Sequence, residues 1–202
     1  MSNIIKLLTH LAFKKKDIVR PMYLDGEKYL VDVKNFITPD DIFLQKVVKD
    51  YKNGKDYDDK MQKCWQYVRD NIKYKSDKID GERKGHWTLP SIILQRGYDD
   101  CDGMSVTLAS LAIASGIPYY RVKVVLGKVQ KDPVAPKGSH AWVLYLNEDN
   151  KWEIWEATNK KKGRKGLAKE LLGNSWYREI YASFNNKYTY DQDKIEDETK
   201  YK

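Results

Sequence analysis

The spacing of the apolar residues changes once along the chain, and this change limits the folds that the sequence can form. Before Gly116 the apolar positions recur every three or four residues, as in helices with one buried face. After Pro118 they alternate with polar positions, as in the strands of an antiparallel sheet. We therefore predict the α+β class, with N-terminal helices packed on an antiparallel sheet that contains residues 120–157.

Capping and turn residues indicate where the elements begin and end. Helices are predicted from Thr38-Pro39-Asp40-Asp41 to Asn53-Gly54, over 59–72, from 99–101 to Gly116, and over 167–181. Strands are predicted over 120–126, 140–146 and 151–157, and Asp25-Gly26 is the expected turn of an earlier hairpin. Residues 74–90 and 127–139 are predicted to be loops, the second of them lining a cleft.

Length and composition favour one folded domain. The 202 residues can bury a core, and six Trp and fifteen Tyr argue against general disorder. We expect an N-terminal extension at 1–37, the folded domain at 38–184 and a flexible charged tail at 185–202. The apolar run near the N-terminus is too short to span a membrane, and its lysines follow the run, unlike those of a signal peptide. A cytoplasmic location is predicted, or a virion-associated one for a viral source.

The charge pattern and the metal-binding residue types exclude several functions. A net charge of +8 favours acidic partners, yet Lys and Arg are scattered along the chain. Because no helix-turn-helix, RNP or zinc-finger pattern is present, no specific nucleic-acid partner is predicted. Three His and two Cys show no metal-ligand spacing, so neither a metal nor an organic cofactor is predicted.

Cys101 stands where the third helix is expected to begin. A helix N-terminus lowers the pKa of a thiol, and its free N–H groups can hold an oxyanion. The other cysteine, Cys64, falls in the middle of a predicted helix and is interpreted as a packing residue. We therefore predict that Cys101 is the reactive thiol of the two.

His140 and Glu156 belong to neighbouring predicted strands. In the register that puts the apolar residues of both strands on one face, residue 146 pairs with 150 and His140 lies directly opposite Glu156. Taken singly, each residue is more often structural than catalytic. The ordered set of Cys101, His140 and Glu156 favours a nucleophile with its base and an orienting carboxylate.

Five segments of the chain match one known family. They are WQYVRDNIKY (65–74), DCDGMS (100–105), ASGIP (114–118), HAWV (140–143) and WEIWEAT (152–158). With them, the stretch from Met61 to Asn159 resembles the core of the transglutaminase-like superfamily, particularly its bacterial and phage-type members. The resemblance implies a papain-like fold with Cys101 as nucleophile, His140 as general base and acid, and Glu156 as the orienting carboxylate.

The sequence departs from the family pattern at two positions near this set. Glu156 stands where the family usually has Asp, and Asp99 stands where Gly is common, two residues before the cysteine. Trp87 and Gln95 lie upstream of Cys101 and could each supply a side-chain donor to the oxyanion.

The resemblance implies acyl transfer on amide bonds, in a protease or amidase or in protein cross-linking, through a thioester on Cys101. A protein or peptide substrate is implied. The alternative is a non-catalytic structural or adaptor protein, such as a virion component. Such a protein would meet an assembly partner through the N-terminal segment and the C-terminal tail. In an active enzyme, Glu156→Gln is expected to cut turnover strongly, and Glu156→Asp to retain much of it.

Overall fold

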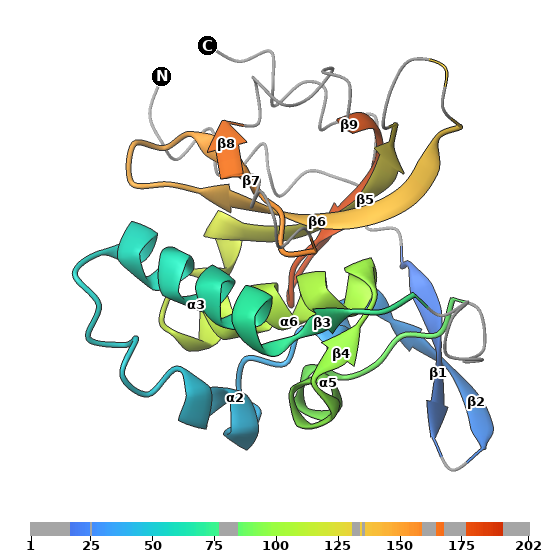
Figure 1. The fold of residues 1–202 in the computed structure, drawn as a ribbon, viewed down its shortest axis with the longest axis horizontal. Helices are drawn as coiled ribbons and strands as arrows, with labels where there is room; N and C mark the ends of the chain where they lie inside the picture. The colour runs from blue at the N-terminus through green and yellow to red at the C-terminus, as the bar shows by residue number, and fades with distance from the viewer. Residues whose placement is uncertain are drawn as a thin grey trace.

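The computed structural model describes residues 17–24, 26–76, 85–130, 134, 136–158, 165–167 and 177–191. An antiparallel sheet, in the strand order β10-β9-β5-β6-β7-β8, lies against a layer of helices (Figure 1). Its strands are β5 (Val122–Val129), β6 (Gly138–Leu146), β7 (Trp152–Trp155), β8 (Lys165–Leu167), β9 (Tyr177–Phe184) and β10 (Thr189–Asp191). The predicted α+β class, with helices on an antiparallel sheet, is confirmed.

Helix α6 (Cys101–Ala114) is the central helix of the domain. Asp100 caps its start, and Gly116, with a φ of +97°, follows its end in a conformation that favours glycine. The helix contacts β5 and β6, and it also contacts the three helices α2 (Ile42–Val47), α3 (Tyr57–Asn71) and α5 (Pro90–Arg96). Because neighbours surround it, nearly every residue from Gly103 to Ala114 is buried. In the described part of the chain, no helix is long and apolar enough to cross a membrane.

The two faces of the sheet bury different apolar residues. Val124 and Val143 point to the core that α6 completes, whereas Val125 and Trp142 belong to a second apolar cluster on the opposite face. This alternation is the one expected for strands with a two-residue period. His140 is two residues before Trp142, so its side chain lies on the same face of the sheet, the face that carries the second cluster.

The N-terminal hairpin packs on the domain core instead of forming a separate extension. Strands β1 (Val19–Leu24) and β2 (Glu27–Asp32) flank the predicted turn, and the short helix η1 (Val33–Phe36) follows them. Val33 and Phe36 are both 0% exposed and belong to the same core as α6. The expected boundary at residue 37 is therefore wrong, because these side chains complete the core. Residues 1–16 lie outside the described part.

Two predictions about the helical half need correction. Helix α2 begins at Ile42 because Asp41, and not Thr38, caps it by accepting a hydrogen bond from Phe43 N, and it ends at Val47 instead of near residue 53. Helix α5 was not predicted, although Pro90 at its start and Gly97, with a φ of +73°, at its end are ordinary helix boundaries. Two short parallel strands, β3 (Lys73–Tyr74) and β4 (Tyr98–Asp99), pair beside it.

Two C-terminal predictions also fail. Residues 177–181 belong to strand β9, so the helix expected over 167–181 is wrong there, and residues 168–176 lie outside the described part. The prediction of a flexible tail from residue 185 is wrong for residues 185–191. Asn185 is buried and donates to Tyr119 O, and β10 pairs with β9. Aromatic surface on Tyr188 and Tyr190 makes this packing favourable. Residues 192–202 lie outside the described part.

Candidate active site

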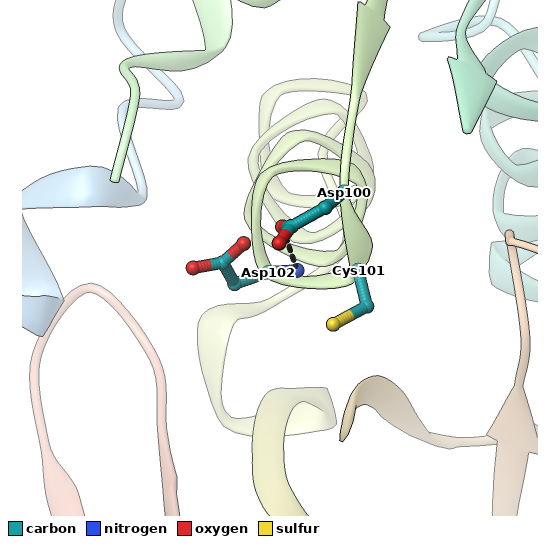
Figure 2. Close-up of side chains that lie close together, drawn as sticks. All are labelled: Asp100, Cys101 and Asp102. Carbon is teal, nitrogen blue, oxygen red and sulfur yellow. Dashed lines mark hydrogen bonds between the residues drawn. The ribbon is translucent and has the colours of Figure 1, made fainter. Parts of the chain in front are cut away.

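Cys101 is the first residue of α6 and lies against strand β6. The side chain of the capping residue Asp100 accepts a hydrogen bond from Asp102 N at 3.2 Å, and the three side chains spread from the first turn of the helix (Figure 2). The backbone N–H of Ala141 faces the thiol and lowers its pKa. Since Ala141 follows His140 directly, the start of the helix and the strand that carries the histidine meet at one place.

His140 and Glu156 are in contact, as predicted. His140 Nε2 lies 2.6 Å from Glu156 Oε2, and the two side chains are only 13% and 5% exposed. With Nε2 engaged by the carboxylate, Nδ1 is the ring nitrogen left for a second partner. The structure shows no hydrogen bond between this ring and the Cys101 thiol among the described residues.

The strand register that led to this prediction is wrong by two residues. Leu146 pairs with Trp152 instead of residue 150, so the connecting loop covers 147–151. Asn147 stabilises the longer loop because its Oδ1 accepts from Lys151 N at 2.8 Å, and Asn150 adopts a φ of +58°. An even shift leaves every side chain on its face, so Glu156 still shares a face with His140 but lies diagonally from it.

The carboxylate of Glu156 is charged although it is buried. Burial raises its pKa, but the charge and hydrogen bond of His140 and two hydrogen bonds from Thr158 outweigh this effect. The pKa of Glu156 therefore lies below its ordinary value. A charged carboxylate beside the imidazole is the arrangement that orients a catalytic histidine.

The predicted activation of Cys101 by the helix N-terminus is wrong for the resting site. Burial raises the pKa of the thiol well above its ordinary value, and the charges of Asp102 and Asp100 raise it further. The N–H of Ala141 lowers the pKa, but by less than these effects raise it. Burial also raises the pKa of Cys64, to about 12. Accessibility and neighbours, not acidity, therefore distinguish the two thiols, since Cys64 is fully buried and Cys101 is not.

Asp99 fits its position because residue 103 is a glycine. Its Oδ1 accepts from Asp100 N at 2.7 Å, and its Oδ2 lies 2.8 Å from Arg96 Nη2 in an ion pair not aligned for a hydrogen bond. The carboxyl group rests directly on the α-carbon of Gly103, where an added Cβ would lie 2.3 Å from its Cγ. The acidic residue that replaces the usual glycine before the cysteine is thus accommodated by a second glycine within the helix.

Asp99 is expected to make stability fall with rising pH. Burial raises its pKa to about 7, despite Arg96, so the folded state holds a proton that the unfolded state has released above its model value of 3.8. Between these values stability declines as pH increases. We expect Asp99→Asn to gain stability relative to the parent, by at most about 4 kcal/mol, between pH 4.5 and 8.5. Urea unfolding at both pH values checks this, and a difference independent of pH would contradict it.

The acidic residues around Cys101 could offer ligand atoms to a cation, a possibility that the His and Cys spacing did not reveal. One ligand atom each from Asp100, Cys101 and Asp102 lie within 4.8 Å of one another. Burial and the hydrogen bond with Asp100 raise the pKa of Asp102 well above its ordinary value, which disfavours the charged carboxylate that a cation would need. Three ligand atoms fall short of the six to eight oxygens that calcium usually takes.

The two side chains predicted as oxyanion donors lie in different environments. Trp87 is buried, with its ring centroid 5.2 Å from that of Phe36 and 5.9 Å from that of Phe184. Gln95 is exposed on α5. Neither makes a hydrogen bond to Cys101 among the described residues, so both roles stay predictions.

The backbone of the first turn offers another oxyanion donor. The N–H groups of Asp102 and Gly103 donate to the carboxylates of Asp100 and Asp102. These carboxylates do not bind the N–H of Cys101, which is therefore the first-turn donor available to an oxyanion. Its position at a helix start was visible in the sequence, but the engagement of the next two N–H groups was not.

The sequence model of one family matches this region. The model describes the transglutaminase-like superfamily and matches residues 45–157, just over half of the chain. The chain belongs to the transglutaminase-like superfamily. Within this superfamily match lie Cys101, His140 and Glu156, whereas strand β9 lies beyond its end. No curated protein sequence matches the chain.

Solved structures of other proteins resemble the fold of this chain. LapG from Legionella pneumophila has a TM-score of 0.56 at 14% identity, over 79% of this chain and 92% of that one. The EGTA-treated form of LapG has a TM-score of 0.57 at 14% identity, over 81% and 85% of the two chains. A protein from Cytophaga hutchinsonii, described as a putative cysteine protease, is 19% identical, with a TM-score of 0.47, over 81% of this chain and 53% of that one. At these identities the likeness concerns the fold.

Proposed function

We propose that this protein is a cysteine-dependent hydrolase or acyltransferase that acts on amide bonds of a protein or peptide. Cys101 would be the nucleophile, His140 the general base and acid, and Glu156 the residue that orients His140. The observation that carries the proposal is the 2.6 Å contact between His140 Nε2 and Glu156 Oε2. It lies beside the strand residue whose N–H contacts the Cys101 thiol.

The proposed reaction proceeds through a thioester. Cys101 Sγ attacks the amide carbonyl carbon while His140 Nδ1 takes the thiol proton, and the resulting oxyanion is held by the N–H of Cys101. The C–N bond then breaks, and His140 gives its proton to the departing amine. Water, or the amine of a lysine, attacks the thioester with His140 as base. The product is an acid or a new amide, and the thiol is restored.

The raised pKa of Cys101 decides how the first step begins. At neutral pH the resting thiol is protonated, because burial and the two flanking aspartates disfavour the thiolate. Proton transfer to His140 must therefore accompany the attack on the substrate, as in general-base catalysis. Hydrolysis is the preferred outcome, because transfer to lysine needs a second bound substrate that excludes water.

Chemical labelling tests the proposal without knowledge of the substrate. A small acyl-type electrophile, followed by peptide mapping, is expected to modify Cys101 at least tenfold faster than Cys64, which is fully buried. His140→Ala should slow the labelling of Cys101 and leave that of Cys64 unchanged. Cys64→Ser serves as the matched control and should label like the parent. Equal rates at the two thiols, or no effect of His140→Ala, would remove the proposed nucleophile and base.

The same labelling experiment can test whether calcium affects the reaction of Cys101. One LapG structure was solved after treatment with EGTA, a calcium chelator, and Asp100 and Asp102 here offer carboxylates beside Cys101. A cation bound between them would offset the negative charges that raise the pKa of the thiol. Labelling of Cys101 would then be faster in calcium than in EGTA. Identical rates would leave the two aspartates as helix-capping residues.

One observation favours the alternative of a non-catalytic structural or adaptor protein, such as a virion component. The thiol of Cys101 lies among negative charges that oppose the thiolate, an arrangement that a binding protein tolerates without loss. Labelling that does not depend on His140, with the fold intact, would support this alternative.

A further inference from the structure

We propose that Thr158 and Tyr177 are positioning residues that hold the carboxylate of Glu156 against His140. The inference deepens the proposed function and rests on it. It assigns a role in the site to strand β9, which supplies Tyr177 from beyond the part of the chain that the family match covers.

Hydrogen bonds reach both oxygens of the Glu156 carboxylate from two sides. Oε1 accepts from the backbone N–H of Thr158 at 2.9 Å and from its Oγ1 at 2.7 Å. Oε2 faces His140 Nε2 at 2.6 Å and accepts from the hydroxyl of Tyr177 at 3.4 Å. A carboxylate has about four acceptor positions, so these contacts occupy its capacity. The carboxyl group cannot turn away from His140 without losing hydrogen bonds in a buried site.

A glutamate needs such support more than an aspartate would. Its longer side chain has an additional rotatable bond, and fixing it costs more conformational entropy. The diagonal position of Glu156 relative to His140 requires that length. Thr158 fixes one carboxylate oxygen from two residues away in the chain, and the other oxygen is then aimed at His140.

Tyr177 also supports the histidine through aromatic ring contacts. Its ring is buried, and its centroid lies 5.0 Å from that of Trp142 at an angle of 61°. Trp142 in turn lies 6.1 Å from the ring of His140 at an angle of 29°. The rings of Trp142 and Tyr177 pack beside the His140–Glu156 pair, and such packing keeps water from competing for the carboxylate. The hydroxyl of Tyr177 adds a hydrogen bond without disturbing these ring contacts.

Two isosteric variants test the inference. Thr158→Val removes Oγ1 and keeps the backbone N–H, whereas Tyr177→Phe removes one oxygen and keeps the ring. In each variant the charged carboxylate of Glu156 loses one hydrogen-bond donor, so we expect the His140-dependent reaction of Cys101 to be slower. The rate should fall roughly tenfold in Thr158→Val and by less in Tyr177→Phe, because the hydrogen bond from Tyr177 is longer. The acidic limb of the pH–rate profile should move to higher pH, because a carboxylate with fewer donors protonates more readily.

The controls separate positioning from folding. Thr158→Ser restores the hydroxyl and should recover the parent rate and pH profile. Tyr190→Phe alters another buried tyrosine, packed over Lys123 at 4.2 Å, and should change neither. If Thr158→Val fails to fold, Tyr177→Phe decides the question. A parent-like pH profile in Tyr177→Phe and in any folded Thr158→Val, or no recovery in Thr158→Ser, overturns the inference.

A measurement that needs no catalysis keeps this inference distinct from the proposed function. In ¹⁵N-labelled protein, the proton on His140 Nε2 should give a resonance protected by its hydrogen bond to Glu156. We expect this resonance to shift and to exchange faster in Thr158→Val and Tyr177→Phe, even with Cys101→Ala in the background. An unchanged resonance overturns the positioning role. If the parent protein shows the His140 resonance but Cys101 is not labelled, the proposed function is overturned instead.

Discussion

Gly103→Ala should destabilise the folded protein by about 3 kcal/mol or more, the largest loss of stability expected near the candidate site. Alanine would normally stabilise a helix relative to glycine by about 1 kcal/mol. Here the new methyl group would lie 2.3 Å from both Cγ and Oδ2 of Asp99, distances that no packed structure tolerates. Asp99 cannot move away easily, because it holds Asp100 N and pairs with Arg96.

A double-mutant cycle shows whether this clash is the cause. The added methyl would also lie 2.8 Å from the Cβ of Asp99, so Asp99→Gly, and not Asp99→Ala, is the relieving change. In the Asp99→Gly background, Gly103→Ala should be neutral or stabilising. Urea unfolding at pH 7 of the four proteins gives the coupling energy. If Gly103→Ala destabilises both backgrounds equally, the clash with Asp99 is not the cause of the destabilisation.

The meeting of His140 and Glu156 could be predicted from the sequence even though the strand register could not. The apolar alternation determines which face a strand residue occupies, and a shift by two residues leaves that face unchanged. The register itself depends on the loop, where Asn147 accepts from Lys151 N and Asn150 takes a positive φ. Such side-chain-to-backbone hydrogen bonds leave no periodic trace in a sequence.

Strand β9 was predicted as a helix for a specific reason. The helix predicted over 167–181 includes β9 only as far as Tyr181. The large apolar residues of β9 are Tyr177, Ile180, Tyr181 and Phe184, and this spacing also fits one face of a helix. Irregular pairing with β5, where the register shifts between Leu126 and Gly127, accommodates this spacing in a strand. The error also hid Tyr177 from the candidate site.

The acidity of Cys101 could not be predicted from its place at a helix start. The dipole of a helix favours the thiolate, but only weakly and over a short range. Burial and the adjacent carboxylates of Asp100 and Asp102 act on the same sulfur and are larger. How deeply the thiol is buried, and how close the two carboxylates lie to it, are properties of the packed structure.

Glu156→Gln should lower His140-dependent activity more than any other change outside Cys101 and His140, and Glu156→Asp should also lower it. Gln keeps the shape but lacks the charge that stabilises a protonated imidazole, so we expect a loss of about 10³–10⁴-fold. Asp keeps the charge but is one methylene shorter. The sequence-based register predicted that Asp would retain much activity, because directly opposed residues have Cβ atoms only about 4.5–5.5 Å apart.

The observed register changes the expectation for Asp. Continuing the pairing of Val143 with Trp155 places Glu156 opposite Trp142, so His140 lies on the diagonal, where Cβ atoms are up to about 7–8 Å apart. An aspartate carboxylate would fall short of His140 Nε2 and would also leave the two donors of Thr158. We therefore expect Glu156→Asp to lose activity by at least about tenfold, as for a lost charged hydrogen bond.

Matched measurements make both variants interpretable. Glu153→Gln alters a carboxylate of β7, three residues before Glu156. Glu153 accepts from Trp155 Nε1 and Asn147 Nδ2, so the change should affect stability but not the labelling of Cys101. Labelling rates and melting temperatures are compared for the three variants and the parent. Parent-like labelling in Glu156→Gln would remove Glu156 from the reaction. Parent-like labelling in Glu156→Asp alone would mean that the chain after β7 can bring residue 156 closer to His140, so that charge, and not length, decides whether the histidine is oriented.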